Sequence, residues 1–158
     1  MSIQPLPSIA PARSIYFAEV LMARASITPQ DAGCQSYLIY KLEKLGFFCE
    51  KYTINGVSNL IARWGQGPNH FAFSGHTDVV PPGPLDKWKS PPFSPVISKN
   101  RLYGRGAADM KTGIAAMLAA TERTIDSLDG SKVSFWWLIT SHEEGAAEWG
   151  SKWIGEAL

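Results

Sequence analysis

The most continuously apolar stretch of the sequence is Val133–Thr140, which reads Val-Ser-Phe-Trp-Trp-Leu-Ile-Thr. A run this rich in aromatic and branched side chains predicts a strand that is covered by other elements. A shorter strand is predicted at His70–Ser74, and Asp109–Leu128 between them has apolar residues at helical spacing. The order strand, helix, strand favours a parallel pair crossed by the helix.

Helices are also predicted on both sides of this unit. Arg13–Ala25 carries apolar residues at helical spacing. Thr28–Asp31 supplies a capping oxygen, a proline suited to the first helical position and an early acid, so it predicts the start of a second helix that ends at Gly46. The proline-rich passage Pro81–Pro95 is predicted to be an irregular surface excursion. Ala146–Leu158 has the composition of a last helix.

A hairpin is predicted between the second helix and the His70 strand. Phe47–Ile54 and Val57–Trp64 read as strands, and the Asn55-Gly56 pair between them suits a type I′ turn. These elements together predict an α/β fold with a mixed, mainly parallel sheet flanked by helices. The parallel strands are expected in the middle and the antiparallel hairpin toward an edge.

Composition excludes several classes of function. The 158 residues are 45% hydrophobic with a net charge of +1 that we read as evenly spread, which indicates one globular domain and argues against nucleic acid as a partner. The longest apolar run, Phe135–Ile139, is too short to cross a membrane. The first ten residues lack Lys and Arg and include Pro5 and Pro7, so we expect no secretory signal and a cytoplasmic protein. Cys34 and Cys49 are expected to be buried thiols.

Histidine and acidic residues follow the two predicted strands. His76 and Asp78 come directly after the first strand, and side chains two residues apart in extended chain point to the same side. A histidine that binds a metal commonly donates its other ring N–H to a carboxylate, which Asp78 can supply. The alternative is a surface histidine beside a turn aspartate.

Further acidic residues follow the second strand and end a glycine-rich turn. Glu143 and Glu144 follow the second strand and are expected to project in opposite directions, one toward a metal and one toward a water. Alone, they also fit a solvated acidic turn. Asp109 ends the glycine-rich turn Gly104–Asp109. That turn lacks the Lys-Ser/Thr of a P-loop and the third glycine of a dinucleotide site, so nucleotide binding is rejected.

Together these side chains favour a metal-dependent hydrolase. Imidazole and carboxylate oxygens suit a pair of zinc or similar ions bridged by a carboxylate. Two such ions polarise a carbonyl and lower the pKa of a shared water, while a nearby glutamate takes its proton. The reaction class that this chemistry implies is hydrolysis of an amide.

Several longer motifs occur in a set order over almost the whole chain. They are Ser26–Gln35, Ser58–Arg63, Ser74–Gly83, Trp88, Pro91–Phe93 and Leu102–Lys111. In this combination the sequence resembles the di-zinc aminoacylase and carboxypeptidase family of metallohydrolases. The resemblance implies a zinc-exopeptidase-like catalytic domain with two divalent ions, zinc first and cobalt as an alternative. Within the family it points to members that hydrolyse N-succinyl-LL-2,6-diaminopimelate to succinate and LL-diaminopimelate in lysine biosynthesis.

The resemblance also implies a role for each site residue. His76 would bind one metal, Asp109 would bridge, and Glu144 would bind the second metal. Glu143 would be the general base, and Asp78 would be the acid behind His76. His142 departs from the family, which usually has aspartate there; it is not a ligand position, and we expect only a local electrostatic change.

Length is the larger departure. Family members are much longer, so residues 1–158 are expected to be a truncated, amino-terminal segment of the catalytic domain. The dimerisation domain of a homodimeric parent and the carboxy-terminal catalytic segment, with its remaining ligands, would be absent. The short chain is then expected to be inactive alone. The alternatives are an acetylornithine deacetylase or carboxypeptidase of the same family, and a noncatalytic remnant or interaction fragment.

Overall fold

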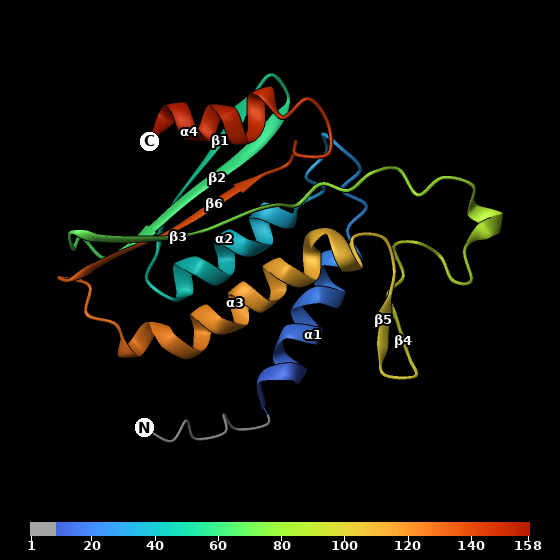
Figure 1. Cartoon of the computed structure of the whole chain (residues 1–158), viewed down its shortest axis with the longest axis horizontal. Coiled ribbons are helices and arrows are strands. Elements are labelled where there is room, and N and C mark those ends of the chain that lie inside the picture. The colour runs from blue at the N-terminus through green and yellow to red at the C-terminus, as the bar shows by residue number, and fades with distance from the viewer. Residues whose placement is uncertain (1–8) are drawn as a thin grey trace.

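The sheet is built around β6, the strand that the apolar stretch predicts (Figure 1). The computed structural model describes residues 9–158, with side chains from residue 13 onwards. The elements in chain order are α1 (Ile9–Met22), α2 (Cys34–Lys44), β1 (Phe48–Ile54), β2 (Val57–Trp64), β3 (Asn69–His76), β4 (Val96–Ser98), β5 (Arg101–Tyr103), α3 (Thr112–Thr124), β6 (Val133–Thr140) and α4 (Trp153–Ala157). The larger sheet has the order β1-β2-β6-β3, and β4 and β5 form a separate hairpin.

Helices cover both faces of the larger sheet. α1, α2 and α3 lie on one face, where α1 packs against α3, and α4 lies on the other (Figure 1). Alternate side chains of β6, Phe135, Trp137 and Ile139, are buried in the core with Leu38 of α2 and Leu118 of α3. The period-two alternation of a strand therefore turns one set of its side chains into the main core.

The mixed sheet flanked by helices is confirmed, but the proportion of parallel to antiparallel strand pairs differs from the expectation. Only β3 and β6 pair in parallel; β2 pairs antiparallel with both β1 and β6. A mainly parallel sheet with its parallel strands in the middle is thus not found among residues 9–158, where β3 is an edge strand. The reason is that a parallel pair needs a crossover, and this part of the chain contains one, through α3.

The local turn predictions are confirmed. Asn55 and Gly56 have φ values of 49° and 79°, as a type I′ turn requires. Gly46 follows α2 with a φ of 83°, the left-handed conformation that ends a helix.

Both amino-terminal helices have different bounds from those predicted. α1 ends at Met22 rather than at residue 25, because Ser26 O accepts from Val79 N and the extended chain after it pairs with Val79. The second helix begins at Cys34 and not at Thr28–Asp31. Ala32 and Gly33 have positive φ values of 48° and 80°, so helical geometry starts only after them.

The two later helices are shorter than predicted. α3 begins at Thr112, after a π-helical turn at Ala107–Lys111 in which Asp109 has extended angles (φ −131°, ψ 108°). The predicted last helix is divided into a π-helical turn at Glu148–Lys152 and the short α4. It is broken at Gly150, where an added Cβ would lie 2.5 Å from Thr140 Oγ1.

The proline-rich excursion is irregular as predicted, apart from one 3₁₀ turn at Leu85–Lys87. It is followed by the β4–β5 hairpin, which the sequence analysis did not predict. Each of its strands has three residues, which is too short to show a pattern, and Lys99 and Asn100 form its turn with positive φ.

Three further expectations concern the rest of the chain. Residues 1–8, with Pro5 and Pro7, lie outside the described residues. Across residues 9–158 we find no helix with the length and apolarity that a bilayer crossing requires. Cys34 is buried and Cys49 is half-buried, and both are free thiols.

Trp137 and its neighbour Trp136 offer a test of the core. Trp137 is fully buried, whereas Trp136 points to the other face, where it stacks on His70. We expect Trp137→Ala to lower the free energy of unfolding by about 3 to 5 kcal/mol, because a large cavity is left. Trp136→Ala should cost about 1 kcal/mol or less. Urea unfolding measures both, and equal losses would contradict this placement of the core.

Candidate metal centre

The parallel pairing of β3 and β6 brings two distant loops together. His76 is opposite Thr140 in the register, so the chain leaves both strands at the same edge of the sheet. Thr77 continues the contact, because its N–H donates to Thr140 O at 2.8 Å. Ligand sites in α/β folds collect at this carboxyl edge, and His76 and Glu143 lie there.

Asp78 joins the two loops. Its side chain is fully buried, Oδ1 accepts from Glu143 N at 3.2 Å and Oδ2 accepts from Glu144 N at 3.1 Å. One carboxylate therefore sets the backbone course of both glutamates. The chain is bent here rather than extended, and Glu143 and Glu144 both lie near His76 instead of projecting in opposite directions.

His76 is held at both ring nitrogens. Nδ1 lies 3.0 Å from Asp78 O and 3.4 Å from Asp78 Oδ1, and Nε2 lies 3.0 Å from Asp109 Oδ1. Glu143 Oε2 is 3.8 Å from the same Nε2. The contact that the sequence predicts between His76 and Asp78 is thus present, and it leaves Nε2 facing the carboxylates.

Asp109 reaches this point because its segment is anchored on both sides. Gly106 before it has a φ of 79°, and an added Cβ would lie 2.7 Å from Val79 Cγ1. Lys111 after it is fully buried and donates from Nζ to Leu21 O at 2.9 Å and to Arg24 O at 2.7 Å, close to the end of α1. Cationic donors suit a helix carboxyl end. The anchored π turn directs Asp109 away from the helix and toward His76.

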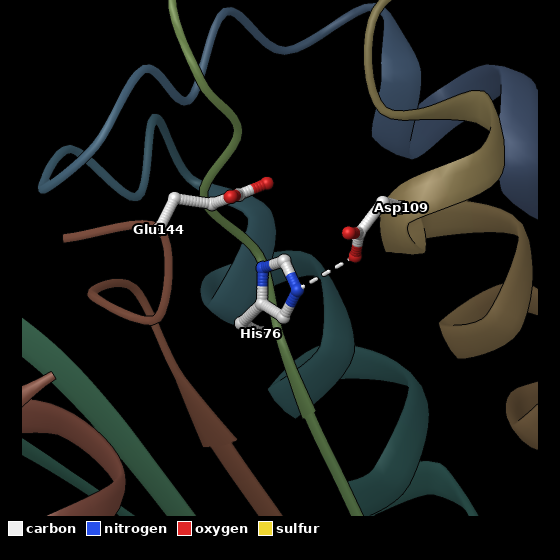
Figure 2. Close-up of side chains that lie close together, drawn as sticks. All are labelled: His76, Asp109 and Glu144. Atoms are coloured by element: carbon white, nitrogen blue, oxygen red, sulfur yellow. Dashed lines mark hydrogen bonds and ion pairs between the residues drawn. The ribbon is translucent and has the colours of Figure 1, made fainter.

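His76, Asp109 and Glu144 form a group with metal-ligand chemistry. One ligand atom from each lies within 4.8 Å of the others, and Figure 2 shows the three side chains converging from separate segments. Zinc binds imidazole nitrogen and carboxylate oxygen at about 2 Å, so ligand atoms around one ion are roughly 3 to 4 Å apart. Small side-chain rotations achieve this, and the three residues therefore fit a divalent cation. A second ion that shares Asp109 would need further ligands.

The charges of the group indicate why it suits a cation. Burial opposes the charged form of His76, but the hydrogen bonds and charges of Asp78 and Asp109 outweigh burial and raise the pKa of His76 to about 9. Burial and the charge of Asp109 raise the pKa of Glu144 above its ordinary value. Carboxylates crowd around one imidazole here, and a divalent cation relieves their repulsion.

Asp78 differs from Asp109, which is exposed, and from Glu144, which is half-buried. Burial alone would raise the pKa of Asp78, but the hydrogen bonds from His76 and from the Glu143 and Glu144 N–H groups lower it below the ordinary value. The carboxylate is therefore ionised in its buried position, where its role is to hold other groups in place.

A second buried acid, Asp31, supports the site and was not singled out as functional. Its Oδ1 accepts from Thr77 Oγ1 at 2.9 Å and from Gln35 N at 3.0 Å. Gln35 Nε2 in turn donates to Ser58 O at 2.8 Å. The sequence suggested Asp31 only as an acid in a first helical turn, and its contact with the residue beside His76 is visible only in the fold.

The other two histidines lie apart from the metal-ligand group. His70 is exposed, stacks on Trp136 with ring centroids 6.1 Å apart, and accepts from Trp136 Nε1 at 3.2 Å. His142 is half-buried and lies against Gly145.

A cavity of about 860 Å³ opens beside the metal-ligand group. Asp109 and Glu144 are part of its wall, and the rest comes from Val80, the proline-rich excursion, the β4–β5 hairpin and the glycine-rich turn that follows the hairpin. Trp88 anchors the excursion by donating from Nε1 to Pro82 O at 2.9 Å. The space next to the candidate ligands is large enough for a small-molecule substrate.

Comparison with known sequences adds an independent line of evidence on the family of this chain. The model of peptidase family M20/M25/M40 matches residues 72–158. The chain is 80% identical over all 158 residues to succinyl-diaminopimelate desuccinylase 1 of Alteromonas mediterranea and covers 40% of that protein. It is 51% identical over 146 residues to succinyl-diaminopimelate desuccinylase of Janthinobacterium sp. (strain Marseille), covering 92% of this chain and 39% of the relative. It spans about two fifths of the length of these relatives.

Solved structures show the same fold. Human carnosine dipeptidase 1 superposes with a TM-score of 0.75 at 21% identity, covering 97% of this chain and 38% of that one. An M20 family metallo-carboxypeptidase from Sulfolobus solfataricus superposes with a TM-score of 0.71 at 27% identity, covering 80% of this chain and 30% of that one.

The raised pKa of His76 predicts a pH dependence of stability in the metal-free protein. The pKa is about 9 in the fold against 6.5 for an ordinary histidine, so its stabilising contribution is complete below pH 6.5 and is lost as the pH rises through 9. We expect the free energy of unfolding to fall by up to about 3 kcal/mol between pH 6 and pH 9.5. Urea titrations with a chelator present measure it.

Two variants test whether His76 causes this pH dependence of the free energy of unfolding. His76→Gln should remove most of the pH dependence, whereas His70→Gln should retain it because His70 is exposed. A loss that persists unchanged in His76→Gln would show that another group is responsible.

Asp78→Asn tests the role of the buried carboxylate. The amide can accept only one of the two backbone hydrogen bonds, so we expect zinc affinity to fall about 10- to 100-fold as the loop loses its position. The free energy of unfolding should fall by about 1 to 3 kcal/mol. Competition with a chromophoric chelator measures the affinity. Asp126→Asn, at an exposed position, is the control, and an unchanged affinity in Asp78→Asn would count against the positioning role.

Proposed function

This chain belongs to peptidase family M20/M25/M40, whose model matches more than half of it, and we propose that it forms the metal-binding part of an amide hydrolase. The substrate that we propose is N-succinyl-LL-2,6-diaminopimelate, which would be hydrolysed to succinate and LL-diaminopimelate in lysine biosynthesis. The 80% and 51% identities to proteins named succinyl-diaminopimelate desuccinylase support this choice over a deacetylase or carboxypeptidase of the same family.

The observation that carries the proposal is the convergence of His76, Asp109 and Glu144 within 4.8 Å, beside a cavity that two of them line. We assign these three side chains as the metal ligands, with Asp109 as the bridge between two ions. Zinc is the first choice and cobalt the alternative, because imidazole and carboxylate ligands suit both. The three side chains come from three separate segments of the chain. A solvated acidic turn would not bring such distant segments together.

The chain's own residues would divide the chemical work. Divalent cations bound here would polarise the amide carbonyl and lower the pKa of an attacking water. Glu143 would accept the proton of that water at a carboxylate oxygen and deliver it to the amide nitrogen as the C–N bond breaks. Asp78 would keep Nδ1 of His76 as the donor, so that Nε2 presents its lone pair.

The same proposal assigns the chain's place in the larger protein. We propose that residues 1–158 form an amino-terminal segment of the catalytic domain. The remaining metal ligands and the dimerisation domain of a homodimer would come from the other three fifths of such a protein. Catalytic zinc normally has three protein ligands, and the described residues cannot supply three to each of two ions. A small charged substrate of amino-acid synthesis also agrees with the cytoplasmic location predicted from the sequence.

A chimera tests the function directly. We would replace the matching segment of the Alteromonas mediterranea relative with residues 1–158 of this chain and measure turnover of N-succinyl- and N-acetyl-diaminopimelate. The succinyl substrate should be preferred. Glu143→Gln in the chimera should lower turnover by about 10²- to 10⁴-fold with zinc content unchanged, because the proton acceptor is lost.

Glu156→Gln, an exposed glutamate of α4, is the matched control and should be fully active. Preference for the acetyl substrate would favour a sibling enzyme of the family. A folded, zinc-binding chimera without turnover of either substrate would favour a noncatalytic fragment.

A further inference from the structure

The cavity beside the metal-ligand group has a one-sided charge. Four basic residues line it, and among the described residues its acidic lining is limited to Asp109 and Glu144, which the proposed cations would neutralise. The four are Lys87, Lys89, Lys99 and Arg105. The chain between residues 87 and 105 contains five basic residues and no acidic one, so charge is less evenly spread than the overall balance suggests. This bias was the signal that the sequence analysis missed.

Arg105 differs from the three lysines because it is held in place. The lysines are exposed, whereas Arg105 is half-buried, with its guanidinium 5.2 Å above the ring of Trp88. Its Nη2 donates to Pro81 O at 3.4 Å, and its backbone N–H donates to Pro92 O at 2.7 Å. Trp88 is itself tied to Pro82. The side chain is therefore oriented by the excursion before any ligand arrives.

The guanidinium has no acidic partner in the described part of the chain. Within residues 13–158 no carboxylate oxygen lies within 4 Å of it, whereas Arg13 pairs with Glu122 at 2.8 Å. Its Nε is also buried without a hydrogen-bond acceptor. An unpaired buried donor is unfavourable, and a bound anion would supply the missing acceptor.

We propose that Arg105 binds a carboxylate of the substrate and so makes the cavity selective for acidic ligands. A planar guanidinium matches a carboxylate with two parallel hydrogen bonds. Lys87, Lys89 and Lys99 at the cavity wall add a positive potential that attracts the anion. The inference rests on the proposed function only in placing the scissile amide at the metal-ligand group.

The carboxylate could stand on either side of that amide. The acyl arm of a succinylated substrate ends in one, and the amino-acid arm carries others. Both arms present a carboxylate to Arg105, whereas a neutral ligand of equal size has no carboxylate to present. Specificity of this kind comes from a charged partner whose absence leaves the guanidinium unpaired.

Binding to the 158-residue protein tests the proposal without turnover. We would follow the indole N–H signal of Trp88 by NMR during titration with succinate and, separately, with neutral succinamide, in chelator-treated protein. Succinate should shift the signal and succinamide should not. Arg105→Gln should weaken succinate binding by roughly 10- to 100-fold, and Arg105→Lys by less.

Arg63→Gln is the matched control. Arg63 also lies over a tryptophan, 5.4 Å from the ring of Trp136, but it is not part of the cavity wall. This variant should bind succinate as tightly as the wild type. Titration with N-methylsuccinamate and with diaminopimelate then identifies the arm, since only the ligand whose carboxylate meets Arg105 should lose affinity in Arg105→Gln.

Equal binding of succinate and succinamide, or an unchanged succinate affinity in Arg105→Gln, would overturn the proposal. These outcomes are separate from failure of the proposed function. A protein that binds succinate through Arg105 but does not bind zinc through His76, Asp109 and Glu144 would refute the hydrolase assignment alone. Zinc binding with no effect of Arg105 would refute the carboxylate site alone.

Discussion

The geometry of the metal centre depends on one buried carboxylate. Asp78 follows β3, and its two oxygens accept the backbone N–H groups of Glu143 and Glu144, which follow β6. Asp78 Oδ1 also lies 3.4 Å from Nδ1 of His76. Because the carboxylate is fully buried, loss of any of these hydrogen bonds leaves an expensive unpaired group, so the two loops are held in one arrangement. Parallel pairing of the strands brings the loops to the same edge, and Asp78 converts that proximity into a fixed site.

Several carboxylates crowd around one imidazole in this centre, and divalent cations would offset their negative charge. In the absence of metal, His76 is held protonated by the acids around it, with a pKa of about 9, and the pKa of Glu144 is raised by burial and by Asp109. A cation at Nε2 of His76 would take the place of that proton and meet the carboxylates at once. The tertiary structure therefore places carboxylates of like charge close together. Their repulsion lowers the stability of the fold unless a bound ligand offsets it.

Polar support under the site and positive charge beside it come from different parts of the chain. Asp31 and Gln35, near the start of α2, form hydrogen bonds with Thr77 and with Ser58 at the start of β2. Arg105 and Trp88 lie in the wall of the cavity that opens next to Asp109. Asp31, Trp88 and Arg105 lie in irregular segments, whereas Gln35 belongs to α2. Functional groups on irregular segments are commonly positioned by a rigid scaffold. The apolar core of β6 and the helices supplies that scaffold.

The sequence by itself determined the four strands of the larger sheet, the β1–β2 hairpin and the pairing of His76 with Asp78, because alternation, an Asn-Gly turn and a two-residue spacing are local patterns. It also marked Asp109, Glu143 and Glu144, through their types and positions. Only the tertiary structure decided that Asp109 leaves the predicted helix to meet His76, since Lys111 anchors it to carbonyls 87 and 90 residues away. The tertiary structure likewise decided the proportion of parallel and antiparallel strand pairs, the contact of Asp31 with Thr77 and the position of Arg105 away from any acidic side chain of the described residues. These depend on contacts between residues far apart in the chain, and no local pattern encodes which distant partner a side chain will meet.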